Sequence, residues 1–188
     1  MSVIHFIWAG LVNHLQTGGI VPSQRFLIDK MIQPIPPTYR GQLVELGAGN
    51  GALTIRLARR CSAARILACE LNPVLARDTR LNLAAAGLEA HANVLSDSAQ
   101  HLLSSRLNRR LPRLHYIISG LPLGNLGRRH AREHLDLIHH NLLPSGLYIQ
   151  FQHSLLDLKN IRSRFAHVQI LPVLLNFPPA FVYYATAA

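Results

Sequence analysis

Cysteine is nearly absent from this chain of 188 residues, in which only Cys61 and Cys69 occur. Their number and spacing argue against a disulfide framework and against a cysteine-ligated metal site, so we expect a reducing, cytoplasmic location. His130 and His134 have a metal-ligand spacing on one predicted helix face, but no cysteine or further acid completes a site. We therefore predict no bound metal and a solvated helix face at these histidines.

Long hydrophobic runs are lacking as well. No apolar stretch reaches the ~18–20 residues that a membrane-spanning helix needs. The N-terminus carries neither a basic region nor a clear small-residue cleavage site, so no signal peptide is predicted. The length fits one domain with a substantial core, since 49% of the residues are hydrophobic and only 15% are charged.

Acidic residues are scarce relative to basic ones. Nine Asp and Glu residues face nineteen Lys and Arg residues, which gives a net charge of +10. Such a balance favours an anionic partner, either nucleic acid or an anionic membrane surface, over a basic protein without a charged partner.

Glycine is concentrated in one stretch, residues 42–51, which reads Gln-Leu-Val-Glu-Leu-Gly-Ala-Gly-Asn-Gly. A short apolar strand runs into three alternating glycines, and a helical pattern follows over residues 52–60. The glycines allow a tight turn and let a ligand approach the main chain. The N-terminus of the following helix points its N–H groups and positive dipole end at the same place.

A second apolar strand, residues 65–70, ends in Glu70, 23 positions after Gly47. In nucleotide-binding folds an acid about 20 residues beyond the glycine turn holds the ribose hydroxyls. A solvated Glu70 after an ordinary strand is the alternative. The order of turn, helix and acid favours the nucleotide interpretation.

The segment Val-Glu-Leu-Gly-Ala-Gly-Asn-Gly resembles motif I of the class I S-adenosylmethionine-dependent methyltransferases. This resemblance implies S-adenosylmethionine as cofactor and S-adenosylhomocysteine as product, with Glu70 on the ribose and Asp97 beside the adenine. For Asp97 a helix cap remains the alternative. The cofactor-binding residues implied are Glu45, Gly47, Ala48, Gly49, Gly51, Glu70, Leu71, Asp97, Ser98 and Ser119.

Strand and helix patterns alternate after residue 41, which indicates a mainly parallel sheet covered on both faces. The fold class expected is α/β: a Rossmann-like seven-stranded mixed sheet with helices on both faces, an antiparallel C-terminal hairpin and extra N-terminal helices. Strands are expected at residues 42–46, 65–70, 89–95, 115–119, 147–152, 167–171 and 180–186. Helices are expected at residues 52–60, 73–87, 98–108 and 128–142.

The N-terminal residues 1–37 are predicted to be a helical segment and linker that caps the substrate or membrane side of a methyltransferase domain at residues 38–188. Residues 2–16 have helical periodicity with Trp8 on the apolar stripe. A helix packed on the core and a helix in a membrane interface are equally compatible with this pattern. A second short helix with Ser23 as N-cap and a stiff, proline-rich linker at 34–37 follow.

Residues 119–123, Ser-Gly-Leu-Pro-Leu, end the fourth predicted strand, where the carboxyl ends of parallel strands form a ligand crevice. Adenine and amide methyltransferases of this class carry a polar residue and an aromatic residue at the first and last of these positions. Here Ser119 and Leu123 occupy them, and the missing ring counts against a nucleobase. The predicted substrate-binding residues are Gly120, Leu121, Pro122 and Leu123.

Together with residues 17–23, 149–154 and 176–183, this loop resembles the bacterial phospholipid N-methyltransferases. The resemblance implies methyl transfer to the amine of phosphatidylethanolamine or of a related aminolipid such as ornithine lipid. It also implies peripheral association with the inner membrane, with the N-terminal helix on the bilayer. We expect the chain to be a monomer. His153 stands where the family pattern has tyrosine, which leaves the headgroup open.

The amine must lose its proton before it attacks, and the predicted catalytic residues are Tyr116 and His153, which could also be purely structural. The alternative activity is that of an RNA adenine N6-dimethyltransferase, which the net charge supports. Nucleic acid is nevertheless the less favoured partner. A donor-binding module without activity is the remaining alternative.

Overall fold

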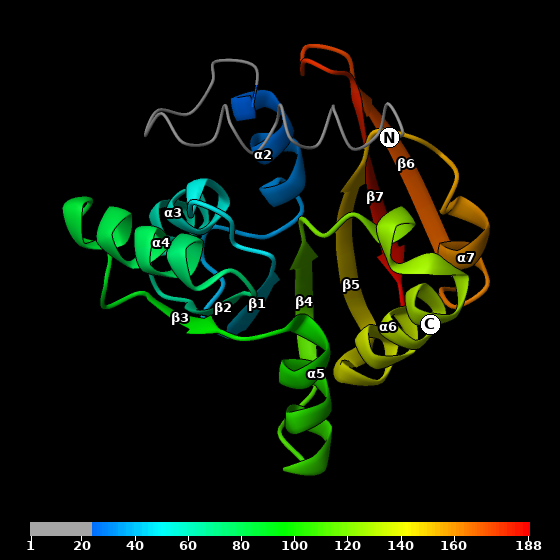
Figure 1. Cartoon of the computed structure of the whole chain (residues 1–188), viewed down its shortest axis with the longest axis horizontal. Coiled ribbons are helices and arrows are strands. Elements are labelled where there is room, and N and C mark those ends of the chain that lie inside the picture. Colours follow the sequence, from blue (N-terminus) through cyan, green and yellow to red (C-terminus); the bar gives the residue numbers. More distant parts are fainter. Residues whose placement is uncertain (1–23) are drawn as a thin grey trace.

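The computed structural model describes residues 24–188. The predicted helix at residues 2–16 and the predicted N-cap at Ser23 lie outside this range and stay predictions. Within it the chain forms one seven-stranded sheet flanked by helices (Figure 1).

The strand order is β3-β2-β1-β4-β5-β7-β6. The strands are β1 (Gln42–Leu46), β2 (Arg65–Glu70), β3 (Ala92–Ser96), β4 (Leu114–Ser119), β5 (Leu142–Gln152), β6 (His167–Val173) and β7 (Ala180–Thr186). The first five are parallel, and β7 inserts antiparallel between β5 and β6. The predicted mixed sheet with an antiparallel C-terminal hairpin is therefore confirmed.

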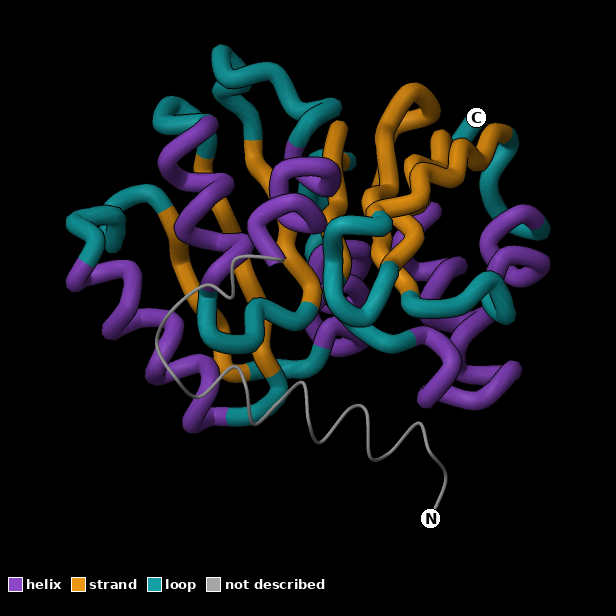
Figure 2. Tube along the Cα trace, turned by 90° about the horizontal axis from the view of Figure 1, so that it is seen from above, coloured by secondary structure: helices purple, strands orange, loops and turns teal. Residues whose placement is uncertain are grey.

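Helices cover both faces of the sheet, as Figure 2 shows from above. They are α2 (Gln24–Ile32), α3 (Ala52–Arg60), α4 (Pro73–Ala85), α5 (Ala99–Asn108), the 3-10 helix η1 (Leu123–Leu126), α6 (Gly127–Asn141) and α7 (Leu158–Arg162). Because side chains alternate along a strand, Leu43 faces α2 and α3 while Val44 faces α5 and α6. α4 packs on Ala68 and Val94 over the outer strands.

Several element boundaries differ from those predicted. β5 begins at Leu142, where a bulge between Leu114 and Tyr116 lets the longer strand stay paired with β4. The short helices η1 and α7 were not predicted from periodicity, since each spans about one turn.

The proline-rich segment at 34–37 is also more than a linker. Ile35 is fully buried in the core cluster of α2 and α3, and its carbonyl accepts a hydrogen bond from Arg60 Nε at 3.2 Å. The Tyr184 hydroxyl on β7 donates to the Lys30 carbonyl on α2. Residues 24–37 are thus packed against the sheet through side chains and hydrogen bonds.

The strand order reverses direction between β1 and β4, which are neighbours in the sheet. In open parallel sheets the helices that follow two such strands leave to opposite faces, and a crevice opens at the carboxyl ends. This switch point places the glycine stretch after β1 beside the loop after β4.

Candidate functional site

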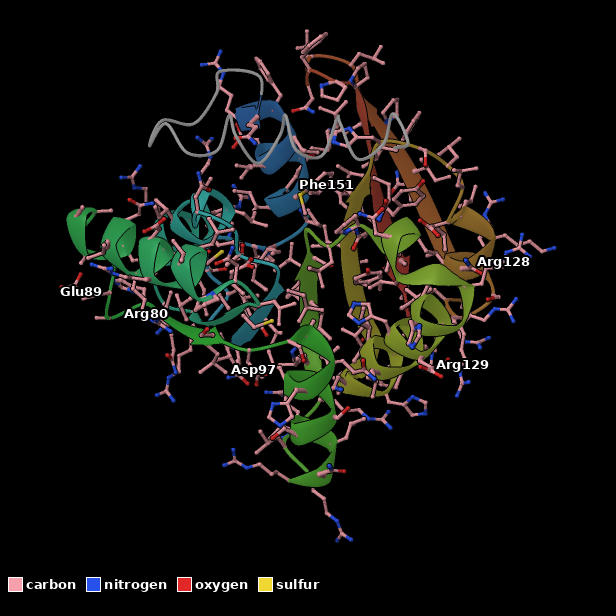
Figure 3. The ribbon with its side chains drawn as sticks, viewed as in Figure 1. Arg80, Glu89, Asp97, Arg128, Arg129 and Phe151 are labelled. Atoms are coloured by element: carbon pink, nitrogen blue, oxygen red, sulfur yellow. The ribbon has the colours of Figure 1, made fainter. Side chains whose placement is uncertain are left out.

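A cleft of about 790 Å³ lies at the carboxyl edge of β1, β2, β4 and β5. This volume falls within the roughly 300–1,000 Å³ that small-molecule pockets occupy. Its lining comes from four places: the N-terminal helix α2, the glycine stretch, the segment after β2, and the ends of β4 and β5. Phe151, labelled in Figure 3, lies between α2 and the end of β4.

The glycine stretch is held in an open shape by α4. The Thr79 hydroxyl donates to the Gly49 carbonyl at 2.7 Å, and the Asn82 amide donates to the Asn50 carbonyl at 2.9 Å. Gly47 and Gly49 have φ of 80° and 58°, which favour glycine. A Cβ on Gly49 would meet no atom within 4 Å, so the space there is open for a ligand.

Glu70 is fixed at the end of β2 by two main-chain donors. Its Oε2 accepts from Gly49 N–H and its Oε1 from Asn72 N–H, both at 2.9 Å. The carboxylate lines the cleft beside Leu71. Each carboxylate oxygen keeps further acceptor capacity, so Glu70 can receive hydrogen bonds from a ligand's hydroxyls.

Glu45 on β1 is fully buried and also lines the cleft. Neither carboxyl oxygen has a hydrogen-bond partner among the described residues. Burial raises the pKa of Glu45 to about 8; the nearby Thr54 side chain opposes this rise, and the charge of Glu70 adds to it. A buried, unpartnered carboxyl group is costly, and this one is placed to receive a cation or a hydrogen-bond donor.

Asp97 and Ser98 follow β3 but are not among the residues that line the cleft. Asp97 Oδ1 accepts from Ser98 N–H at 2.7 Å, and its Oδ2 contacts His101 Nδ1 at 2.6 Å. The Ser98 hydroxyl caps α5 by accepting from His101 N–H. Figure 3 shows Asp97 at the start of α5, well apart from Phe151. Ser98 is therefore the N-cap of α5, whereas Asp97 precedes the cap, and its placement beside an adenine stays a prediction.

Gly51 and Ser119 shape the site without lining it. Gly51 adopts φ of 86° at the start of α3, and a Cβ there would lie 2.8 Å from Thr79. Ser119 is fully buried, and its hydroxyl accepts from Leu121 N–H at 3.2 Å. Ala48, by contrast, lines the cleft together with Gly47 and Gly49.

The loop after β4 brings Gly120, Leu121 and Pro122 into the cleft lining. Gly120 N–H donates to Leu46 O at 2.9 Å, which joins the loop to β1. The carbonyl of Leu121 accepts from the side-chain amides of Gln150 at 2.8 Å and Gln152 at 3.4 Å. Both lone pairs of this carbonyl are therefore used within the protein.

Leu123 lies differently from its prediction as a substrate-binding residue. It is fully buried in the core cluster beneath η1 and does not line the cleft. The turn into η1 points this side chain inward, which the sequence motif does not reveal. The aromatic ring of the cleft instead comes from Phe151 on β5, a residue that sequence reasoning missed.

Tyr116 is the second correction. It pairs with Leu43 near the start of β1, whereas Ser119 pairs with Leu46 at the carboxyl edge. Three residues along a strand span about 10 Å, so Tyr116 lies well below the cleft. Its ring packs edge-on against Tyr39 with centroids 5.1 Å apart. Tyr116 therefore has a packing role at the amino edge of the sheet.

His153 does line the cleft, at the end of β5. Its Nδ1 donates to the Pro179 carbonyl at 3.0 Å, because a carbonyl can only accept. In the neutral ring this bond leaves the lone pair on Nε2. The ring also meets Phe151 edge-on at 5.7 Å between centroids.

One wall of the cleft is apolar and comes from α2. Leu27, Ile28 and Met31 line it from a helix that sequence analysis assigned only to a cap. The helical spacing of these residues signals an apolar face, but not which part of the chain it covers.

Among residues 24–188, no group of three or more His, Cys, Asp or Glu side chains could hold a metal ion. His134 differs from its prediction, because it is buried on α6 and burial lowers its pKa to about 4. In the same part of the chain no helix is long and apolar enough to cross a membrane.

No protein-family profile matches the chain. An ornithine lipid N-methyltransferase of Singulisphaera acidiphila is 26% identical over 167 residues, which cover 88% of this chain and 85% of that protein. The Bacillus cereus O-methyltransferase in complex with SAH aligns with a TM-score of 0.70 and 17% identity, over 96% of this chain and 88% of that one.

TrmN from Thermus thermophilus aligns with a TM-score of 0.65 and 15% identity, over 86% of this chain. The chain spans only 48% of TrmN. These structural similarities establish a methyltransferase fold, which serves acceptors of different kinds, so the acceptor must be argued from the cleft itself.

Proposed function

We propose that this chain, which has the fold of class I S-adenosylmethionine-dependent methyltransferases, methylates the amine headgroup of a membrane lipid. The acceptor is phosphatidylethanolamine or a related aminolipid such as ornithine lipid. The observation that carries the proposal is the two-sided cleft: polar residues of β1 and β2 on one side, and an apolar wall from α2, Leu121 and Phe151 on the other.

The residues of the polar side fit S-adenosylmethionine. Glu70 offers a carboxylate already oriented by two N–H groups, which suits ribose hydroxyls. Glu45 is an orphaned buried carboxyl that suits the ammonium of an amino-acid moiety. Gly49 leaves space for close approach of the ligand. When bound, S-adenosylmethionine supplies an electrophilic methyl group.

The protein's own contribution is positioning and proton removal. The apolar wall excludes water and lowers the pKa of an amine held there by desolvation. His153 keeps Nδ1 on Pro179, so its Nε2 can take the proton that the ammonium must lose. We assign the general-base role to His153 and none to Tyr116.

The 26% identical ornithine lipid N-methyltransferase supports a lipid amine as acceptor. The loop after β4 supports it as well. Ser119 and Leu123 are buried, and the Leu121 carbonyl already accepts two hydrogen bonds within the protein. The positions that would hold an adenine therefore do not face the cleft. Peripheral association with an anionic membrane follows from the same proposal, to which we add a monomeric chain.

An RNA adenine methyltransferase is the alternative, because the net charge is +10. The exposed arginines Arg109, Arg110 and Arg113, however, flank the start of β4, at the sheet edge opposite the cleft. A nucleic acid bound along them would not present a base to the site.

The deciding experiment incubates the protein with methyl-labelled S-adenosylmethionine and either total lipid, total RNA, or purified phosphatidylethanolamine and ornithine lipid. We expect label in an aminolipid and none in RNA, and reduced transfer by a Glu70→Ala control. Label in RNA alone would overturn the lipid proposal in favour of the alternative.

A further inference from the structure

The loop between β6 and β7 exposes large apolar side chains next to the cleft. The exposed fractions of Leu174, Leu175 and Phe177 are 75%, 68% and 86%. We refer to these three residues as the apolar tip. The loop projects beyond the ends of β4 and β5 (Figure 1). A group of exposed apolar side chains on one loop marks an interaction surface rather than ordinary surface variation.

The loop is held from inside, so the outward side chains are part of its fold. Asn176 is only 4% exposed. Its amide donates to the Pro178 carbonyl at 2.6 Å, and its N–H donates to the Val173 carbonyl at 3.4 Å. With the polar residue turned inward, its apolar neighbours Leu175 and Phe177 turn outward, which reverses the usual arrangement.

The apolar tip is continuous with the proposed acceptor side of the cleft. Val173 pairs with Ala180 at the base of the loop, and Gln152 pairs with Phe181 one residue further on. The hydrogen bond from His153 Nδ1 to the Pro179 carbonyl joins the loop to the cleft lining. Any surface that the tip enters therefore lies against the mouth of the cleft.

Cations flank the tip. A groove between the tip and α2 is lined by Phe26, Lys30 and Arg60 together with Leu174 and Leu175. The Arg25 guanidinium lies 4.7 Å from the centre of the Phe26 ring. The one acid in this groove, Asp29, is already paired with Arg56. Apolar side chains bordered by unopposed cations suit the headgroup region of an anionic bilayer.

We propose that the apolar tip inserts into the interface of an anionic lipid bilayer and so seats the mouth of the cleft on the membrane. The inference rests on the proposed lipid function, since it explains how a lipid amine reaches the site. Nucleic acid would gain little from these side chains, because its affinity comes mainly from phosphate contacts.

The test is flotation of the full chain with vesicles of phosphatidylglycerol and phosphatidylethanolamine. We expect the Leu174→Ser/Leu175→Ser/Phe177→Ser variant to bind vesicles about 10- to 100-fold more weakly than the wild type, because apolar burial is lost. The matched control is Leu81→Ser/Leu107→Ser/Leu111→Ser. It removes three exposed leucines, one from α4, one from the end of α5 and one from the segment after α5, and its vesicle binding should match the wild type.

A second measurement separates docking from catalysis. Methyl transfer is assayed on vesicles and on a short-chain aminolipid below its micelle concentration. The tip variant should lose transfer on vesicles and keep it on the monomeric lipid. If the wild type transferred methyl groups to neither lipid, the proposed function would be wrong. Flotation would still test whether the apolar tip binds the membrane.

Three results would overturn the docking proposal. They are a wild type that does not float, a tip variant that floats as the wild type does, and a wild-type dimer in sedimentation that the tip variant abolishes without any change in flotation. The last outcome would assign the tip to contact with a second copy of the chain.

Discussion

The two sides of the cleft are built in different ways. On the proposed donor side, Glu70 accepts from Gly49 N–H, 21 residues away, and the side chains of Thr79 and Asn82 hold the glycine stretch from 30 and 32 residues away. On the proposed acceptor side, the Gln150 amide donates to the Leu121 carbonyl, 29 residues earlier in the chain. The Tyr184 hydroxyl on β7 donates to the Lys30 carbonyl on α2, which is 154 residues away in sequence. The donor side is thus built within one continuous part of the chain, residues 45–82, whereas the acceptor side also brings together α2 and β7 from near the two ends of the described residues.

Because of this difference, the two sides should tolerate different amino-acid substitutions. A ligand that approaches a glycine-rich main chain and is held by the carboxyl groups of Glu45 and Glu70 needs a fixed backbone, which few sequences provide. An apolar wall made by side chains of α2 and β5 can change residue by residue without altering the fold. Substitutions on one side should therefore affect one ligand and spare the other.

The largest effect is expected from Glu45→Gln on stability. The pKa of Glu45 rises from 4.5 to about 8 on folding. Between these values the folded chain holds a proton that the unfolded chain has released, so the free energy of unfolding falls as the pH rises through this window. The variant cannot ionise and should be more stable than the wild type by about 2–5 kcal/mol at pH 9.

At pH 4 the two proteins should have equal free energies of unfolding, measured by urea denaturation. Glu89→Gln, which changes an exposed carboxylate on the surface (Figure 3), is the matched control and should follow the wild type at both pH values. A pH-independent difference between Glu45→Gln and the wild type would show that ionisation of Glu45 is not the cause. Donor binding by the variant should be weaker, because the acid is gone.

The next effect is expected from Glu70→Ala on donor binding. The change removes a charged acceptor and leaves Gly49 N–H and Asn72 N–H without their bonds. Affinity for S-adenosylhomocysteine, measured by calorimetry, should fall by about 1–3 kcal/mol. Vesicle binding should not change. Unchanged affinity would remove Glu70 from the site, and Glu89→Ala is the control.

Phe151→Ala should give the reverse pattern. Phe151 lines the acceptor side and packs partly against the core. Its loss should raise KM for the aminolipid by about 10-fold, through reduced apolar contact, and leave S-adenosylhomocysteine binding unchanged. Phe151→Leu keeps most of the side-chain volume, so its KM for the aminolipid should lie between those of the wild type and Phe151→Ala. If Phe151→Leu lost affinity for the aminolipid and for S-adenosylhomocysteine equally, the two sides of the cleft would not act independently.

The smallest effect is expected from neutralising Arg109, Arg110 and Arg113 together to glutamine. These arginines lie at the amino edge of the sheet, more than a Debye length of about 10 Å from a membrane at the opposite edge. Vesicle binding should fall by no more than about twofold at low salt and not at all at high salt. A large loss of RNA retention instead would strengthen the nucleic-acid alternative.

The local parts of this protein were predictable from its sequence. The glycine stretch, its following helix and Glu70 are where the motif predicts, and so are the seven strands within a few residues. These features depend on short-range rules: strand and helix periods, glycine at positive φ, and a fixed distance from turn to acid.

The sequence alone could not decide which side chains meet across the cleft. Tyr116 and Leu123 carry suitable chemistry, but strand register places one at the wrong edge and the η1 turn buries the other. Phe151 and the apolar wall from α2 line the cleft only because segments far apart in the chain pack together. Sequence patterns fix backbone conformation over a few residues, whereas long-range contacts arise from burial of the whole core, which no local pattern encodes.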